Sequence, residues 1–389
     1  MTSRKAGRHF LQIPGPSAVP DRILRAISMQ TIDHRGPEFA AVGRAAIEGM
    51  KSIFKTDEGQ VIIYPASGTG AWEAALVNTL SEGDRVLMYE TGHFSMLWMK
   101  LAKRLGLQPE FIAGDWRGGA DANAIAGHLR ADTHHSIKAV CIVHNETSSG
   151  SVSSVAEVRA AIDAVSHPAL LMVDSISGLA SIDFRFDEWG VDVCVSGSQK
   201  GLMLPPGISF NCASKRAMEV ARKGGMRRSY WDWQEMAAMN ASGYFPYTPA
   251  TNMLYGLNEA VAMLHEEGLD NVFARHIRHG RATRAAVRAW GLDILCNRQG
   301  QESGVLTAVM MPEGHSADQF RKTVLEGFDI SLGNGLSKVA DRVFRIGHLG
   351  DFNDAMLMGT LSGIEMALSK AQIPHSKGGT EDAMAVLAG

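Results

Sequence analysis

An unbroken apolar run at residues 169–173 (ALLMV) is the feature that most constrains the fold. A run without polar alternation is typical of a parallel strand that is buried on both faces of its sheet. It ends at Asp174, where small and polar residues (DSIS) take over. Because parallel strands are joined by long crossovers, which are usually helices, the run predicts an α/β protein with a mostly parallel sheet.

A second strand is predicted at residues 191–195, where valines alternate with Asp192 and Cys194. It ends in the turn-forming residues 196–199 (SGSQ), and Lys200 follows directly. A lysine at the end of a buried strand lies in a partly apolar pocket. Desolvation there lowers the pKa of its amine and makes it a better nucleophile toward carbonyls. Taken alone, Lys200 would more often be an exposed loop lysine.

Asp174 favours a reactive Lys200 over an exposed loop lysine. Lys200 follows Asp174 by only 26 residues, at the end of the next predicted strand. Ligands of open α/β sheets bind at the carboxyl ends of the strands, where both residues fall. Pyridoxal phosphate needs this pair of groups: an amine for the Schiff base and a carboxylate that keeps the pyridine nitrogen protonated. Lys200 and Asp174 are therefore the candidate catalytic residues, and pyridoxal 5'-phosphate is the expected cofactor.

Three motifs in order resemble the class V aminotransferases of fold type I. They are VDS at 173–175, SGSQKGLMLPPG at 196–207 and RIGHLG at 345–350. The chain is most similar to the bacterial serine–glyoxylate type and less so to the alanine–glyoxylate type, from residue 14 to about 367. The resemblance implies a large cofactor-binding domain of residues 18–272. It also implies a smaller α+β domain of residues 1–17 and 273–389.

A phosphate site is expected after a strand at 61–64, where the turn 65–70 (PASGTG) leads into a helix. Exposed N–H groups and the helix dipole favour an anion at such a turn. The resemblance assigns Ser67, Gly68 and Thr69 to the cofactor phosphate.

The same turn supports an alternative of another class. Gly68, Gly70 and the acidic Glu90 imitate a dinucleotide-binding fingerprint, although Glu73 stands in place of the third glycine. An NAD-dependent dehydrogenase therefore remains the alternative at this point.

The resemblance implies further cofactor contacts: Phe94, Thr147, Ile176, Gln199, Tyr247 and Thr248. Phe94 matches the aromatic residue that stacks on the pyridine ring, and Thr147 matches the hydroxyl that lies against the ring oxygen. Thr248 belongs to an aromatic loop that crosses the dimer interface in this family and reaches the phosphate of the partner subunit. The aromatic residue of that loop is Tyr247, with Phe245 as the other candidate.

Arg345 is the candidate substrate-binding residue. It stands between Phe344 and Ile346, so its backbone is expected to be partly buried, where an unpaired charge is costly. A guanidinium binds a carboxylate in a bidentate manner, and the family uses the matching arginine for the α-carboxylate. His34 and Arg35 follow by resemblance as substrate contacts, with a solvated loop as the alternative.

These assignments imply an aminotransferase that moves the amino group of a small L-amino acid to glyoxylate. L-Serine is the expected donor, giving hydroxypyruvate and glycine, with Lys200 as general base. Aspartate and alanine remain alternative donors, because a few pocket contacts decide the choice. This chain carries DSIS at 174–177, where bacterial relatives often carry DGVS.

Composition excludes several other classes. A net charge of −3 gives no support for a nucleic-acid or membrane partner, and no apolar run reaches bilayer length. Four dispersed cysteines indicate reduced core residues of a cytoplasmic protein and no metal site. The N-terminal MTSRKAGRHF has no apolar core of a secretory signal, and residues 374–379 are expected to be a mobile polar tail.

Overall fold

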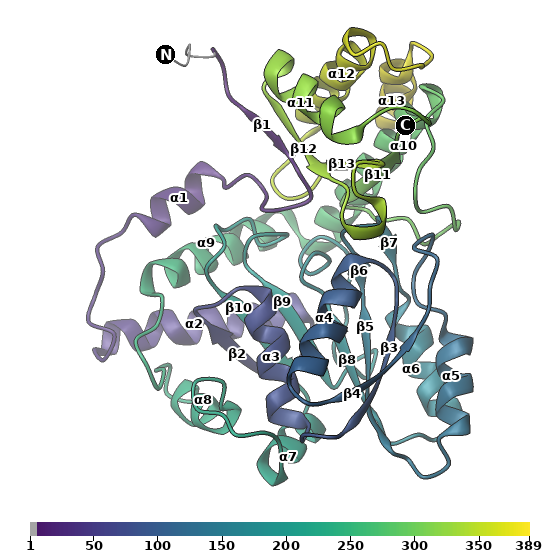
Figure 1. The fold of residues 1–389 in the computed structure, drawn as a ribbon. Helices are drawn as coiled ribbons and strands as arrows, with labels where there is room; N and C mark the ends of the chain where they lie inside the picture. Colours follow the sequence, from purple (N-terminus) through teal and green to yellow (C-terminus); the bar gives the residue numbers. More distant parts are fainter. Residues whose placement is uncertain (1–5) are drawn as a thin grey trace.

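The computed structural model describes residues 6–389. Residues 1–5, part of the stretch in which we expect no secretory signal, lie outside the described residues. The larger sheet has the strand order β2-β10-β9-β8-β5-β3-β4 (Figure 1). Its strands are β2 (Gln60–Tyr64), β3 (Arg85–Tyr89), β4 (Gln108–Ile112), β5 (Ile137–Val143), β8 (Leu170–Asp174), β9 (Val193–Gly197) and β10 (Ser209–Ala213).

The apolar run at 169–173 forms the central strand β8, of which every residue is buried. β8 pairs in parallel with β5 on one side and with β9 on the other. β10 runs antiparallel to both of its neighbours, β9 and β2. The predicted mostly parallel α/β sheet is therefore confirmed, and β8 carries no polar alternation because helices cover both faces of the sheet.

Helices connect these strands and share one apolar core with them. Figure 1 shows α3 and α4 in front of the sheet. The helices are α1 (Asp21–Ile27), α2 (Pro37–Phe54), α3 (Gly68–Thr79), α4 (His93–Arg104), α5 (Ala122–Ala131), α6 (Val155–Ala164), α7 (Lys215–Lys223), α8 (Trp233–Asn240) and α9 (Thr251–Glu267). A short hairpin, β6 (Asn145–Glu146) and β7 (Ser151–Val152), follows β5.

A second sheet, of order β1-β12-β13-β11, lies above the first in Figure 1. Its elements are β1 (Phe10–Gln12), β11 (Leu306–Met310), β12 (Ile330–Asn334), β13 (Val343–Gly347), α10 (Leu269–Ala289), α11 (Ala317–Phe328), α12 (Asp354–Lys370) and α13 (Gly379–Ala388). It has its own apolar core. β1 pairs in parallel with β12, so the start of the described chain belongs to this later sheet.

The end of the chain differs from the prediction. The expected mobile tail of 374–379 leads into α13, which packs against α10. The backbone N–H groups of Gly378 and Thr380 donate to the carboxylate of Glu365 over 2.9 and 3.1 Å. The backbone N–H of Ser376 also donates to the Trp290 carbonyl over 3.0 Å. These backbone partners lie in other elements, so the polar composition of the segment does not reveal them.

Two expectations from composition concern the cysteines and membrane spans. Each of the four cysteines is a buried free thiol, as predicted. No helix within residues 6–389 combines the length and apolar character that crossing a bilayer requires.

Candidate active site

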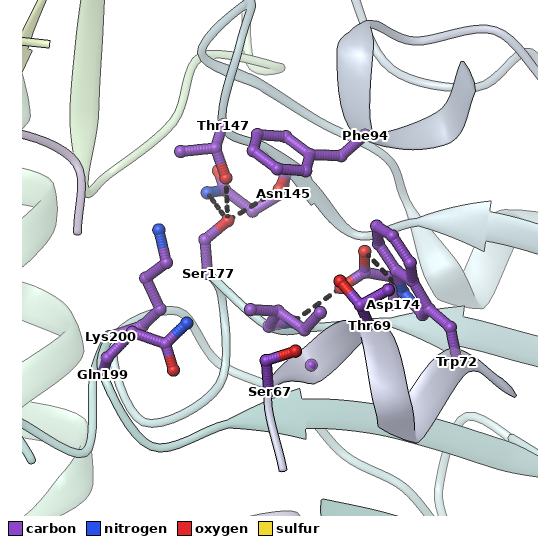
Figure 2. A pocket seen from close by; sticks show the side chains of 12 residues that line it. Ser67, Thr69, Trp72, Phe94, Asn145, Thr147, Asp174, Ser177, Gln199 and Lys200 are labelled. Atoms are coloured by element: carbon purple, nitrogen blue, oxygen red, sulfur yellow. Dashed lines mark hydrogen bonds between the residues drawn. The ribbon is translucent and has the colours of Figure 1, made fainter. Parts of the chain in front are cut away.

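A pocket opens where β2, β5, β8 and β9 end and their following loops meet (Figure 2). The carboxyl ends of parallel strands share one sheet edge, so this is where an α/β sheet collects polar residues. The residues that line the pocket are Ser67, Gly68, Thr69, Trp72, Phe94, Asn145, Thr147, Asp174, Ile176, Ser177, Gln199 and Lys200.

Lys200 follows β9 and is 8% exposed. Its Nζ donates to the carbonyl oxygen of Pro14 over 2.7 Å, while the hydroxyl of Ser17 donates to the Lys200 carbonyl over 2.9 Å. Burial and, to a smaller extent, the positive charge of Arg345 lower the pKa of Lys200 to about 8, against the opposing effect of Asp174. The amine is therefore available as a nucleophile near neutral pH, as the sequence predicts.

Asp174 is the last residue of β8 and is 3% exposed. Its Oδ1 accepts from the backbone N–H of Ile176 over 2.7 Å, and its Oδ2 accepts from the indole of Trp72 over 3.1 Å. Burial raises the pKa of Asp174 to about 7, and the negative charge of Glu146 acts in the same direction. The two N–H donors oppose this rise because they favour the ionised carboxylate.

The N-terminus of α3 supplies an anion site on the same pocket. Ser67 is the N-cap of this helix, but its side chain makes no capping hydrogen bond, so the first N–H groups of α3 keep their capacity for a ligand. Gly68 is required here because a Cβ would collide with the side chain of Ile176. This geometry fits a phosphate group.

Ser177 organises a third part of the pocket. Its hydroxyl accepts from Asn145 Nδ2 over 2.8 Å and from Thr147 Oγ1 over 2.7 Å, and it donates to the Asn145 carbonyl over 2.8 Å. Phe94, in the first turn of α4, lies on the same side of the pocket as Thr147, opposite Ser67 in Figure 2. The pocket thus offers an aromatic face, a hydroxyl and an anion site around Asp174 and Lys200.

Arg345 lies on β13 beside the pocket and is 6% exposed. Its Nη1 donates to the Thr147 carbonyl over 2.9 Å, and its Nε donates to the Asn334 carbonyl over 2.8 Å. Burial lowers the pKa of Arg345 only to about 10, because Glu146 opposes the shift, so the guanidinium stays charged at neutral pH. The second sheet therefore brings a buried cation to a pocket that belongs to the first.

Besides Arg345, which lies beside the pocket, four predicted residues do not line it in this chain: His34, Arg35, Tyr247 and Thr248. Their two segments nevertheless contact each other, since the hydroxyl of Tyr244 donates to the Gly36 carbonyl over 3.3 Å. The ring of Tyr247 stacks on that of Tyr230 with centroids 4.4 Å apart. Arg35 and Thr248 are exposed.

Sequence reasoning missed several residues of the pocket: Trp72, Asn145, Ser177 and, behind Thr147, Glu146. Asn145 and Ser177 follow the buried strands β5 and β8 closely, a position that signals a ligand site. Glu146 is 1% exposed and accepts from Ser148 and from the backbone N–H groups of Phe94 and Ser95. Its carboxylate thus holds the start of the helix that carries Phe94.

The dehydrogenase alternative rests on Glu90, whose carboxylate binds side chains outside the pocket. Its carboxylate accepts from the indole of Trp116 over 2.8 Å and pairs with Lys338, which lies between β12 and β13. It does not line the pocket that Gly68 shares with Lys200. Glu90, the acidic residue that would bind a nucleotide ribose, therefore binds other side chains outside this pocket.

The residues of the pocket fit pyridoxal 5'-phosphate. The amine of Lys200 and the carboxylate of Asp174 share one pocket with the free N-terminus of α3. Gln199 Oε1 is buried there without a hydrogen-bond partner in the described chain. Fold and site together define a pyridoxal-phosphate-dependent enzyme of fold type I.

Comparison with known proteins specifies the family. The model of the aminotransferase class-V family matches residues 10–346, so the chain belongs to this family and is an aminotransferase. This excludes the dehydrogenase alternative. A solved ureidoglycine–glyoxylate aminotransferase from Bacillus subtilis superposes with a TM-score of 0.90 at 25% identity, covering 99% of this chain and 100% of that one.

Curated relatives are similar over nearly the whole chain. A serine–glyoxylate aminotransferase of Methylorubrum extorquens is 47% identical, covering 94% of this chain and 92% of the relative. A serine–glyoxylate aminotransferase of Arabidopsis thaliana is 44% identical, covering 95% and 92%. An L-aspartate–glyoxylate aminotransferase of Paracoccus denitrificans is 43% identical, covering 94% and 92%.

Proposed function

We propose that this aminotransferase moves the amino group of L-serine to glyoxylate, giving hydroxypyruvate and glycine. The observation that carries the proposal is the buried cation of Arg345 beside the pocket of Lys200 and Asp174, because donor and acceptor both carry a carboxylate. The names of the relatives from M. extorquens and A. thaliana support serine and glyoxylate. Aspartate is the second candidate donor, favoured by the relative from P. denitrificans.

Each residue has a proposed part in the reaction. The Lys200 amine bonds to the cofactor and, once released, takes the α-proton from the donor and returns a proton to the cofactor carbon. Bound pyridoxal phosphate supplies an electron sink for the pair left at Cα. Asp174 keeps the pyridine nitrogen protonated, and Arg345 orients the substrate carboxylate.

The other predicted contacts complete the proposed site. Ser67, Gly68 and Thr69 hold the phosphate through the N-terminus of α3. Phe94 and Ile176 face the pyridine ring, with Thr147 and Gln199 at its edge. These roles are supported by the position of all seven residues on one pocket.

We propose further that two copies of the chain share each site. Arg35 and Thr248 are exposed on this chain, while Tyr230 and Met239 are 40% and 38% exposed near the loop 243–249. Apolar side chains exposed beside polar ones suit an interface. In such a homodimer Tyr247 and Thr248 reach the partner's phosphate, and His34 and Arg35 reach substrate.

We propose two further properties of the protein, its division into domains and its location in the cell. Division into a large domain of residues 18–272 and a small domain of residues 1–17 and 273–389 is supported by the two separate apolar cores. A cytoplasmic location is supported by the four buried free thiols.

A donor screen tests the proposed function. The purified holoenzyme is incubated with glyoxylate and either L-serine, L-aspartate or L-alanine, and glycine formation is measured. We expect the highest kcat/KM with serine. A higher kcat/KM with aspartate would replace the proposed donor, and absence of glycine with every donor would overturn glyoxylate as the acceptor.

A further inference from the structure

Two buried tryptophans stack beneath the pocket, and only one of them has a partner for its indole N–H. Trp72 on α3 and Trp98 on α4 are 2% and 0% exposed, with ring centroids 6.0 Å apart and planes 12° apart. Trp72 Nε1 donates to Asp174 Oδ2 over 3.1 Å. Trp98 Nε1 is buried without a hydrogen-bond partner in the described chain.

The carboxylate of Asp174 depends on Trp72 for one of its oxygens. Within residues 6–389, Oδ1 accepts from the Ile176 N–H and Oδ2 accepts from Trp72. Both partners are donors only, so this arrangement suits the ionised carboxylate. Without the indole, Oδ2 would be a buried oxygen with no donor from the chain, which is costly.

The charged and titratable groups that face Asp174 come from β6, from β9 and from the turn after β9. Glu146 on β6 raises the pKa of Asp174, Lys200 after β9 lowers it, and the thiol of Cys194 on β9 is near enough to feel its charge. Burial is the largest influence and favours the neutral carboxyl. The indole N–H is therefore one of few contacts that act against neutralisation.

We propose that Trp72 is a positioning residue for transamination, whose indole N–H holds the Asp174 carboxylate ionised and oriented toward the pyridine nitrogen. This inference rests on the proposed role of Asp174 toward the cofactor. The stacked Trp98 fixes the plane of the Trp72 ring, so the N–H cannot turn away from Oδ2 without breaking the packing between α3 and α4. Trp72 acts through Asp174, and it supplies direction as well as charge stabilisation.

The test compares Trp72→Phe with Trp98→Phe. Both changes remove an indole from the same stacked pair, but only the first removes a donor from Asp174. In the cofactor-free protein, the pH titration of Asp174 is followed by NMR through its side-chain carbon and the Ile176 amide. We expect the Asp174 midpoint to rise by about one to two pH units in Trp72→Phe, the shift that a hydrogen bond to a charged group represents. Trp98→Phe keeps an aromatic ring against Trp72 and removes no donor from Asp174, so it should leave the midpoint unchanged.

A second measurement takes its main result from the wild-type chain, so that result does not depend on how the Trp72 and Trp98 variants fold. The Trp72 indole N–H resonance should titrate with the Asp174 midpoint, and Asp174→Asn should abolish that titration.

In the holoenzyme, Trp72→Phe should lower kcat by about ten- to a hundred-fold with little change in KM for the donor.

Opposite outcomes overturn the inference. An Asp174 midpoint that is equal in wild type and Trp72→Phe, or that rises equally in Trp98→Phe, would leave the indole N–H without this role. A Trp72 indole N–H resonance that does not shift with pH would also overturn the inference. If the NMR titrations follow expectation but no amino acid is transaminated, the Trp72–Asp174 pair stands and the proposed function fails.

Discussion

The Pro14 carbonyl oxygen accepts a hydrogen bond from Lys200 Nζ over 2.7 Å, across 186 residues of sequence. Pro14 closely follows β1, which pairs with β12 in the second sheet. Gly15 comes next with a φ of +107°, and a Cβ at this position would collide with the Lys200 side chain. The segment that leaves β1 of the second sheet therefore contacts the lysine directly and limits where its amine can lie.

This contact predicts the effect of Gly15→Ala. The added methyl group should displace the Lys200 amine, so we expect a marked loss of covalently bound cofactor, measured by absorbance after dialysis. Gly314→Ala is the matched control, because Gly314 also has positive φ (+82°) but a Cβ there would meet no described atom within 4 Å. If the two variants retained equal amounts of cofactor, the close approach of Gly15 to Lys200 would not be important for cofactor binding.

Removal of the amine itself is the direct test of Lys200. Lys200→Ala should abolish turnover and borohydride-trapped cofactor, because no other lysine among residues 6–389 lines the pocket. Mass spectrometry of the trapped wild-type peptide should find the cofactor on Lys200. Undiminished transamination in the variant would disprove the assignment, and the exposed Lys103→Ala serves as the control.

Asp174→Asn tests the partner of the pyridine nitrogen. A neutral amide cannot stabilise a pyridinium, so we expect the rate to fall by several orders of magnitude while absorbance still reports bound cofactor. Asp293→Asn, an exposed change of the same type, should behave as wild type. A near-normal rate with cofactor bound would refute the role of Asp174.

The pH dependence of cofactor capture should report both Lys200 and Arg345. Capture needs the neutral amine, so in wild type its rate should rise with pH and level off above about 8. Arg345 lowers the pKa of Lys200, so Arg345→Gln should move this midpoint to higher pH. Stopped-flow absorbance on the cofactor-free protein measures it, and an unmoved midpoint would exclude the coupling.

Arg345→Lys separates charge from orientation. It keeps the positive charge, so the capture midpoint should stay near that of wild type. It loses the bidentate geometry, so kcat/KM should fall about ten- to a hundred-fold with every donor and acceptor alike. A loss confined to one donor would contradict recognition of the common α-carboxylate.

Hybrid dimers test the shared site. Thr248→Glu should repel the cofactor phosphate, and Lys200→Ala removes the amine, so each variant alone should be inactive. If the two residues serve one site from different copies, a hybrid of the two variants has one intact site, and co-expression should restore activity. A monomer by light scattering that is fully active would contradict sharing.

The fold class and the reacting pair could both be predicted from local sequence patterns. The apolar run that became β8 and the valine-rich strand that became β9 are local patterns. β8 ends at Asp174, and Lys200 lies in the turn just after β9. Because parallel strands place their carboxyl ends on one edge, strand patterns were enough to bring these two side chains together. The turn at residues 65–70, where a phosphate site is predicted, is also recognised from a local sequence pattern.

The groups that surround Asp174 and Lys200 could not be predicted in this way, because they come from distant parts of the chain. The indole of Trp72 reaches Asp174 across 102 residues, the Pro14 carbonyl reaches Lys200 across 186, and Arg345 reaches the Thr147 carbonyl across 198. None of these contacts has a local pattern, since each depends on how a helix or a second sheet packs over the first. Local patterns place residues along a strand, whereas burial and hydrogen-bond partners, which set the pKa values of Asp174 and Lys200, arise when separate elements pack together.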